Sequence, residues 1–257
     1  MGKDRENERK REYEICFQPK ISLTTYKIVG AETVIRWKEE KKAEEDPTYV
    51  LPYARTNEHM VKMDSEVMEE IAAVLENLRK RGICTVPISL RLTAEVLKEP
   101  DFLENFRGIL RQHQLTPEQI EFEISEVDIL SSDKMMDFLI RCKQMGFLLA
   151  LYQVWTVSAV ISKINQISFE RVTLSREVLE RCQRNQTGRE GLQWMIKILK
   201  IHGVKVACEG VENGRQAELL KKAGCDWAHG NRFCVPLTAA EFEKMLVLPL
   251  ETKRLCQ

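Results

Sequence analysis

Short apolar, β-branched runs alternate along the chain with longer segments of helical periodicity. Residues 64–81 carry apolar side chains at every third or fourth position and Glu and Lys on the other face, which predicts an amphipathic helix. This segment ends in basic residues followed by Gly82, a usual helix stop. The runs that predict strands are YKIVGAETVIRW, TVPISLRL, QIEFEIS, FLLALYQV, ERVTLS and VKVACEG.

The unit of helix, glycine and strand recurs around Gly146 and Gly203. This order predicts a parallel sheet with helical crossovers, either a doubly wound sheet or a (β/α)8 barrel. The chain has 257 residues and no GxGxxG turn, which favours the α/β barrel. We expect one barrel domain over residues 15–250, between a charged N-terminal tail or linker helix, 1–14, and a C-terminal tail, 251–257.

Composition narrows the class of protein. The chain has 39 Lys and Arg and 39 Asp and Glu, so no net charge draws it to nucleic acid or to an anionic membrane. The first twelve residues lack the apolar core of a signal peptide, and no apolar run approaches the ~20 residues of a membrane span. Eight scattered cysteines without a CxxC pair are typical of buried thiols in a reducing cytoplasm, and a zinc or disulfide framework stays open for some of them.

Charged and polar side chains stand in the predicted strands or at their ends. In a barrel the functional residues lie where the strands end at the C-terminal face, so Glu32, Glu123 and Glu209 can converge from three strands. Buried carboxylates need cations or hydrogen bonds. One interpretation is a divalent metal; the other is partial exposure or pairing with a nearby Arg. The other polar residues at these ends are Arg91, Tyr152, Gln153 and Ser175.

Several blocks of the sequence, in this order, resemble the EAL-domain family. They read FQPKISLTTYKIVGAETVIRW, PISLRLTAEVL, IEFEISEVDIL and VKVACEGVENGRQAELLKKAGCDWAHGNRFCVPL. The resemblance extends from about Cys16 to about Leu246. It implies a (β/α)8 barrel of the EAL type and a place in bacterial signalling by cyclic di-GMP, which the enzymes of this family hydrolyse.

The resemblance assigns roles position by position. Glu32 stands at the Glu that names the family, in a Glu-Thr-Val motif instead of Glu-Ala-Leu, and Glu123 and Glu209 match metal-binding Glu residues. Arg36 matches an Arg that contacts a ligand phosphate, and Gln18 matches the Gln of a Gln-Pro pair that borders the nucleotide site. Two further matches are Glu126, at a Glu that steadies a loop after a later strand, and Glu212, at the family spacing from Glu209.

The positions that carry out hydrolysis in the family differ in this chain. Arg91 replaces a metal-ligating Asn, and Tyr152 and Gln153 replace a pair of Asp residues. The loop that follows, VWTVSAV, lacks the glycines of the family, so we expect it to be stiff and apolar, either a buried strap or an exposed patch. The remaining replacements are Thr173 for a Lys, Ser175 for an Asp and His229 for a Gln.

These replacements change the charge at the expected metal site. A hard cation such as Mg²⁺ takes about six oxygen ligands, and Tyr152 and Gln153 supply no formal negative charge. A guanidinium ~4 Å from another cation costs about 4 kcal/mol per unit charge at an effective dielectric of 20. We therefore expect Arg91 to replace the metal by bridging Glu32 and Glu123. The alternative is an Arg91 side chain that extends into solvent and pairs with nothing.

Three other residues have two interpretations each. His229 is either a new metal ligand or a hydrogen-bonding substitute for Gln. Trp155 and Trp227 either stack on a guanine base or pack against their neighbours.

Three functions follow from the resemblance. The favoured one is a catalytically inactive domain that acts through a protein partner or an adjacent signalling domain, with no cofactor. The second is a receptor that binds cyclic di-GMP through Gln18, Glu32, Arg36 and Arg91 without cutting it. The third is a phosphodiesterase that depends on Mg²⁺ or Mn²⁺. A homodimer, and a preceding GGDEF or sensory domain, stay open.

Overall fold

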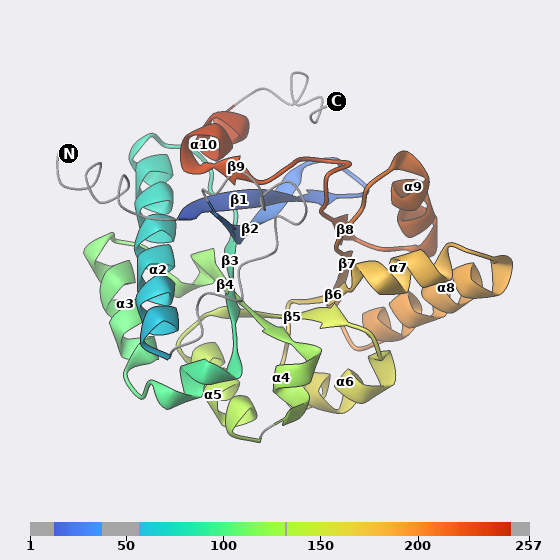
Figure 1. Ribbon diagram of the computed structural model, residues 1–257, viewed down its shortest axis with the longest axis horizontal. Coiled ribbons are helices and arrows are strands. Elements are labelled where there is room, and N and C mark those ends of the chain that lie inside the picture. Colours follow the sequence, from blue (N-terminus) through green and yellow to red (C-terminus); the bar gives the residue numbers. More distant parts are fainter. Residues whose placement is uncertain (1–12, 38–56, 132, 248–257) are drawn as a thin grey trace.

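The computed structural model describes residues 13–37, 57–131 and 133–247, and most of both expected tails lies outside these ranges. Within them, eight strands close into a barrel with helices around the outside (Figure 1). The strands are β1 (Tyr13–Ser22), β2 (Ile28–Trp37), β3 (Ile88–Leu92), β4 (Ile120–Ser125), β5 (Leu148–Val154), β6 (Arg171–Leu174), β7 (Lys205–Cys208), β8 (Trp227–Ala228) and the short outer strand β9 (Leu237–Thr238).

The strand order confirms the predicted α/β barrel and adds one feature. Strands β2 to β8 run parallel in sequence order, whereas β1 lies between β8 and β2 and is antiparallel to both. A short turn joins β1 to β2, and strands joined in this way pair as an antiparallel hairpin. Strand β1 begins at Tyr13, so Tyr13 and Glu14, which the sequence placed in the tail, belong to the barrel.

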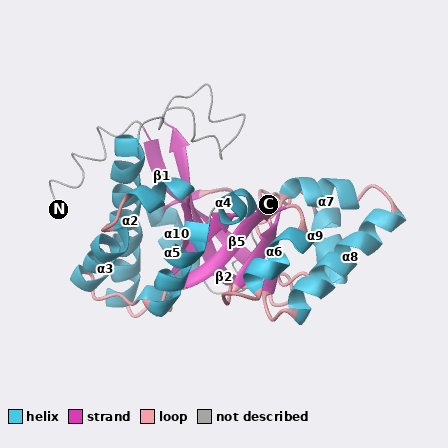
Figure 2. Cartoon of the chain, turned by 90° about the horizontal axis from the view of Figure 1, so that it is seen from below, coloured by secondary structure: helices cyan, strands magenta, loops and turns pink. Residues whose placement is uncertain are grey.

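The helices lie on the outside of the barrel (Figure 2). They are α2 (Asn57–Lys80), α3 (Phe102–Gln112), α4 (Glu126–Ser131), α5 (Asp133–Gln144), α6 (Val157–Ile164), α7 (Arg176–Cys182), α8 (Gln186–Ile201), α9 (Gly214–Ala223) and α10 (Ala239–Val247), with two 3₁₀ turns, η1 (Ala94–Lys98) and η2 (Pro117–Gln119). The predicted helix over 64–81 is α2, which begins seven residues earlier than expected.

Aromatic side chains pack strand β4 against α3. The ring centroids of Phe122 and Phe147 are 4.7 Å apart, and Phe106 stacks on Phe147 at 5.6 Å. All three rings are buried. Because aromatic rings contribute large buried areas, this cluster holds β4, which carries Glu121 and Glu123, in a fixed position.

The described cysteines are free thiols, and most of them are buried. Burial raises the pKa of both Cys16 and Cys142 to about 12, so these thiols remain protonated at neutral pH. Within the part of the chain that the structure describes, none of the helices has the length and apolar character needed to cross a membrane.

Candidate functional site

Arg91 lies among three carboxylates at the C-terminal ends of the strands. Its Nη2 is 2.5 Å from Glu32 Oε1 on β2 and 3.3 Å from Glu209 Oε2, which directly follows β7. Its Nε is 3.8 Å from Glu123 Oε2 on β4. The guanidinium also lies over the Tyr152 ring, 4.5 Å from the ring centroid. The Arg91 side chain is 29% exposed, and these contacts exclude the alternative of an arginine that pairs with nothing.

Glu32 has a second partner across the barrel mouth. His229, which directly follows β8, places Nε2 3.1 Å from Glu32 Oε2, and both side chains are buried. Burial raises the pKa of Glu32, but Arg91 and His229 outweigh it and hold the pKa well below its usual range. The carboxylate of Glu32 is therefore ionised at neutral pH, and His229 occupies a hydrogen-bonding position.

Glu123 divides its two oxygens between the mouth and the interior. Oε2 faces Arg91, whereas Oε1 is 2.5 Å from Lys20 Nζ on β1 and 2.5 Å from Arg171 Nη2 on β6. Both cations are fully buried. Two cationic groups thus hold one oxygen of Glu123 inside the barrel.

A buried ionic network continues below Glu123. Glu121 Oε1 accepts hydrogen bonds from Arg171 and from Ser89 Oγ, the latter at 2.5 Å, and lies 3.3 Å from Lys20 Nζ. Burial raises the pKa of Glu121, and Arg171 and Lys20 outweigh it and lower the pKa below its usual range. This network was not predicted from the sequence. The signal for it is the presence of Lys20 and Arg171 in otherwise apolar strands.

Glu209 has the opposite electrostatic character to Glu32. Burial raises its pKa to about 8; Arg91 lowers it, and the charges of Glu32 and Glu123 raise it. Glu209 is therefore largely protonated at neutral pH. At the C-terminal end of the barrel, Glu32 is therefore ionised at neutral pH, whereas the pKa of Glu209 is close to neutral.

Gln18 and Arg36 contact the chain segment after β8. Gln18 lies opposite Glu32 in the β1–β2 register, and its Nε2 donates to the Cys234 carbonyl at 3.1 Å. Arg36 Nη2 donates to the Pro236 carbonyl at 2.6 Å. Both side chains therefore anchor this segment at the edge of the mouth, where Arg36 stays about one third exposed.

Glu126 holds the altered loop after β5. Its Oε2 accepts hydrogen bonds from the backbone N–H groups of Trp155 at 2.5 Å and Thr156 at 3.2 Å. Gln153 has a φ of 51°, in the left-handed region that non-glycine residues seldom adopt. The Trp155 ring is exposed, whereas Val154, Val157 and Val160 are buried, so the segment is anchored in the core and exposes one large apolar side chain.

The remaining residues singled out in the sequence have structural contacts. Ser175 caps α7 by accepting a hydrogen bond from the Val178 N–H, and Thr173 Oγ1 accepts one from Arg171 Nε at 3.2 Å. The Arg171 guanidinium lies 5.4 Å from the centroid of the Trp227 ring, and Glu212 Oε1 is 2.7 Å from Arg176 Nη2.

A comparison of the chain with known protein families identifies the family to which it belongs. The family model for the EAL domain matches residues 4–236. The chain belongs to the EAL domain family. It is 24% identical over 234 residues to RocR of Pseudomonas aeruginosa, a cyclic di-GMP phosphodiesterase, in an alignment that covers 90% of this chain and 59% of RocR.

Solved EAL structures have the same fold. The MucR phosphodiesterase of Pseudomonas aeruginosa in complex with cyclic di-GMP has a TM-score of 0.80 at 18% identity, over 93% of this chain and 97% of that one. A complex of Klebsiella pneumoniae BlrP1 with manganese and cyclic di-GMP has a TM-score of 0.74 at 18% identity, over 89% of this chain and 56% of that one.

The chain spans less than two thirds of the length of the first curated relatives it matches, between 30% and 59%. Those relatives therefore carry further segments beside the EAL domain. What this chain shares with them is the EAL domain.

Proposed function

We propose that this EAL domain acts in bacterial cyclic di-GMP signalling without hydrolysing the dinucleotide, and that it acts through contacts with another protein in the cytoplasm. One observation carries the proposal: the Arg91 guanidinium lies among Glu32, Glu123 and Glu209. These are the carboxylates expected to bind metal in active members of the family. A permanent cation at this point competes with a metal ion for the same oxygens.

The residues present do not fit a binuclear metal centre. One oxygen of Glu123 faces Lys20 and Arg171, and its other oxygen faces Arg91. Glu209 Oε2 lies 3.3 Å from Arg91 Nη2, so the same guanidinium contacts this third carboxyl as well. Among the described residues, no group of three or more His, Cys, Asp or Glu side chains is arranged to hold a metal ion.

The surface beside the altered loop supports the part of the proposal that concerns a protein partner. Trp155 on the loop and Val127 and Leu130 on α4 are exposed apolar side chains, and α4 contacts both β5 and α6 on either side of this loop. Exposed apolar patches of this kind are typical of interaction sites. The hydrogen bonds from Trp155 and Thr156 to Glu126 hold the loop in place.

A receptor that binds cyclic di-GMP without cutting it is a second candidate. Arg36 is about one third exposed at the edge of the mouth, and a guanidinium binds phosphate oxygens without any metal. The hydrogen bond from Arg36 to the Pro236 carbonyl competes with this role, because it already uses one face of the guanidinium.

Turnover and calorimetry with the whole chain test the proposal. We expect no linear dinucleotide product after prolonged incubation of cyclic di-GMP with the chain and Mn²⁺, under conditions in which an active EAL phosphodiesterase converts the substrate completely. We also expect no heat of binding for cyclic di-GMP, with or without Mg²⁺. Heat that does not depend on metal supports the receptor instead, and steady turnover overturns the proposal.

A further inference from the structure

The C-terminal half of helix α8, which leads to the N-terminal end of β7, exposes an apolar row. Trp194, Ile198 and Ile201 follow one another at helical spacing, and they are 61%, 38% and 74% exposed. Helix α8 packs against α6, α7, α9 and β7 through its other side, and it lies at the outer edge of the molecule in both Figure 1 and Figure 2. Three large apolar side chains in one row on an outer helix are typical of a docking surface.

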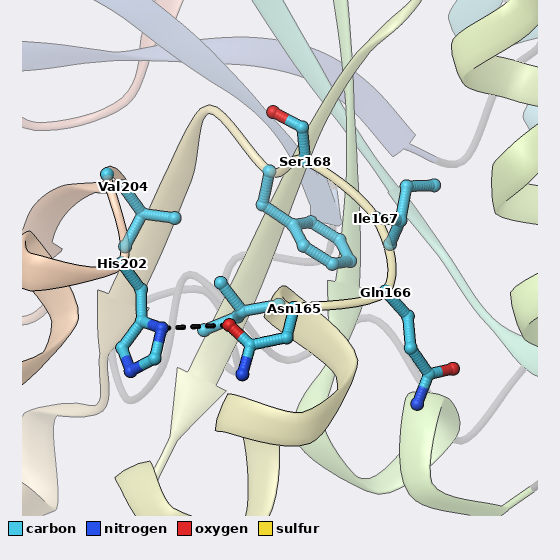
Figure 3. A pocket seen from close by; sticks show the side chains of 9 residues that line it. Asn165, Gln166, Ile167, Ser168, His202 and Val204 are labelled. Atoms are coloured by element: carbon cyan, nitrogen blue, oxygen red, sulfur yellow. Dashed lines mark hydrogen bonds between the residues drawn. The ribbon is translucent and has the colours of Figure 1, made fainter.

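A hollow of about 250 Å³ lies beyond the C-terminal end of α8, and Figure 3 shows the side chains that line it. It is formed by residues 164–169 before β6 and 202–204 before β7, at the N-terminal ends of these strands. His202 Nδ1 and Asn165 Oδ1, 2.8 Å apart, link its two sides. His202, the C-cap of α8, lines the hollow and directly follows Ile201, so the hollow begins where the apolar row ends.

The segments that form this surface have a one-sided charge. Residues 157–169 and 191–205 contain four lysines and no Asp or Glu, in a chain whose acidic and basic residues balance. Two carboxylates directly border these segments: Glu170, which pairs with Lys143, and Glu190, which accepts a hydrogen bond from Gln186. Two of the lysines pair with carboxylates of neighbouring elements, Lys163 with Asp133 at 3.5 Å and Lys200 with Asp226 at 3.1 Å. The other two are Lys197, which lies over the Trp194 ring, and Lys205, which is exposed beside the hollow.

We propose that α8 and the adjoining hollow dock an acidic amphipathic helix of a partner protein. The apolar row would pack against one stripe of that helix, the hollow would receive one of its side chains, and Lys197 and Lys205 would face its carboxylates. This surface shares no residue with the patch around Trp155, so the inference does not depend on the proposed function.

The surface suits a helix better than the other occupants of an apolar, basic face. The apolar core of a bilayer can take up protruding apolar side chains. It does not fill a hollow whose lining includes the polar side chains of Asn165, Gln166 and Ser168. A second copy of the chain, docked through the same helix, would bring Lys197 near its own symmetry mate, and like charges repel.

Selection from a phage-displayed library of random 16-residue peptides on the immobilised chain tests the inference. We expect enriched peptides with apolar residues at spacings of three, four and seven and an excess of Glu and Asp. Their affinity, measured on synthetic peptides by fluorescence polarisation, falls at least tenfold in Trp194→Glu. Ile140→Glu, a matched change of an exposed apolar side chain on α5, leaves the affinity unchanged.

Charge reversal separates a specific surface from general stickiness. The double variant Lys197→Glu and Lys205→Glu is expected to lose the acidic peptides and to select basic ones. Enrichment of nothing, or of peptides whose binding Trp194→Glu leaves intact, overturns the inference. Two other results also overturn the inference, provided that no acidic peptide is selected. One is sedimentation of the chain with phosphatidylglycerol vesicles that Trp194→Glu abolishes. The other is a dimer in solution that Trp194→Glu abolishes.

Discussion

Arg91 Nη2 lies 2.5 Å from Glu32 Oε1, between the neighbouring strands β3 and β2. The two groups stabilise each other's charged form. Burial lowers the pKa of Arg91, but Glu32 and the neighbouring carboxylates raise it further, so the pKa is raised overall. Arg91 in turn helps to hold the pKa of Glu32 below its usual range. Under the proposed function, this ion pair stands where active members of the family are expected to bind a metal ion. Substitutions of Glu32 and Arg91 therefore test how the site is held together.

A double-mutant cycle measures how strongly the two residues depend on each other. Arg91→Met leaves Glu32 buried without its main cation, and we expect a loss of about 3–5 kcal/mol in the free energy of unfolding. In Glu32→Gln the loss is smaller because Glu123 and Glu209 still face the guanidinium. The double variant is expected to recover about 1–3 kcal/mol relative to the sum of the single losses.

Urea unfolding followed by circular dichroism gives the four free energies. The exposed pair Glu95 and Lys98 on η1 serves as the control, with an expected coupling below about 0.5 kcal/mol. Equal coupling in both pairs contradicts a special role for the Arg91 contact.

Restoring carboxylates at the mouth is expected to restore metal binding only if the guanidinium is removed. The triple variant Arg91→Asn, Tyr152→Asp and Gln153→Asp gains two carboxylates and loses the competing cation, and Asp tolerates the positive φ at position 153. With Mn²⁺ at about 100 times its Kd, stability rises by about 2.7 kcal/mol, which is a Tm increase of roughly 5–10 °C. Differential scanning calorimetry measures this increase.

The matched control keeps the charge. It combines Arg91→Lys with the same two Asp substitutions, so it differs from the triple variant only in the cation. We expect no rise in Tm with Mn²⁺ in this control or in the unaltered chain. An equal rise in both variants shows that Arg91 does not exclude the metal.

The sequence predicted the parts of the fold and the site that depend on chain order. Strands β2 to β7 were found because they are β-branched runs between helical segments. Glu32 and Arg91 were expected to meet because the C-terminal ends of parallel strands lie at one edge of a barrel. The helical pattern of α2 predicted its buried face.

The features that the sequence did not predict depend on the closure of the barrel, which brings distant strands together. Strand β1 escaped detection because Glu14, Pro19 and Lys20 interrupt its apolar pattern, and β8 has only two residues. The contact of Lys20 with Glu121 joins residues 101 positions apart. No local pattern of residues encodes the register that brings β1, β4 and β6 together inside the barrel.

Glu126 is expected to control the order of the loop after β5. Glu126→Ala leaves the N–H groups of Trp155 and Thr156 without their acceptor, at a local cost of about 1–3 kcal/mol. Amide hydrogen exchange by NMR should therefore accelerate at these two positions by about 10- to 100-fold.

Two variants check the assignment of this effect to the acceptor oxygen. Glu126→Gln keeps one acceptor oxygen and should show a smaller acceleration. Asp128→Asn lies on the same helix but contacts Ser125 instead of the loop, so exchange at Trp155 and Thr156 should not change. Acceleration at these amides in Asp128→Asn would mean that α4 as a whole, and not the Glu126 carboxylate, holds the loop.

The raised pKa of Glu209 predicts a pH dependence of stability. Its pKa is about 8 in the folded chain, chiefly because of burial, against an ordinary value of 4.5. The folded state therefore keeps a proton that the unfolded state releases, and this contribution to stability is complete below about pH 4.5 and lost as the pH rises to about 8. Glu32 does not oppose the trend, because its lowered pKa places its titration below this range.

Unfolding free energies measured between pH 5 and pH 8 test this sign. We expect Glu209→Gln to flatten the decline, by at most about 1.4 kcal/mol per pH unit, because the amide keeps the uncharged form at every pH. Glu212→Gln, three residues further on, removes a half-exposed carboxylate that pairs with Arg176 outside the mouth, and it should leave the slope as in the unaltered chain. If the unaltered chain gains stability from pH 5 to pH 8 and Glu209→Gln removes that gain, Glu209 is ionised in the folded state. Its contact with Arg91 is then a full ion pair.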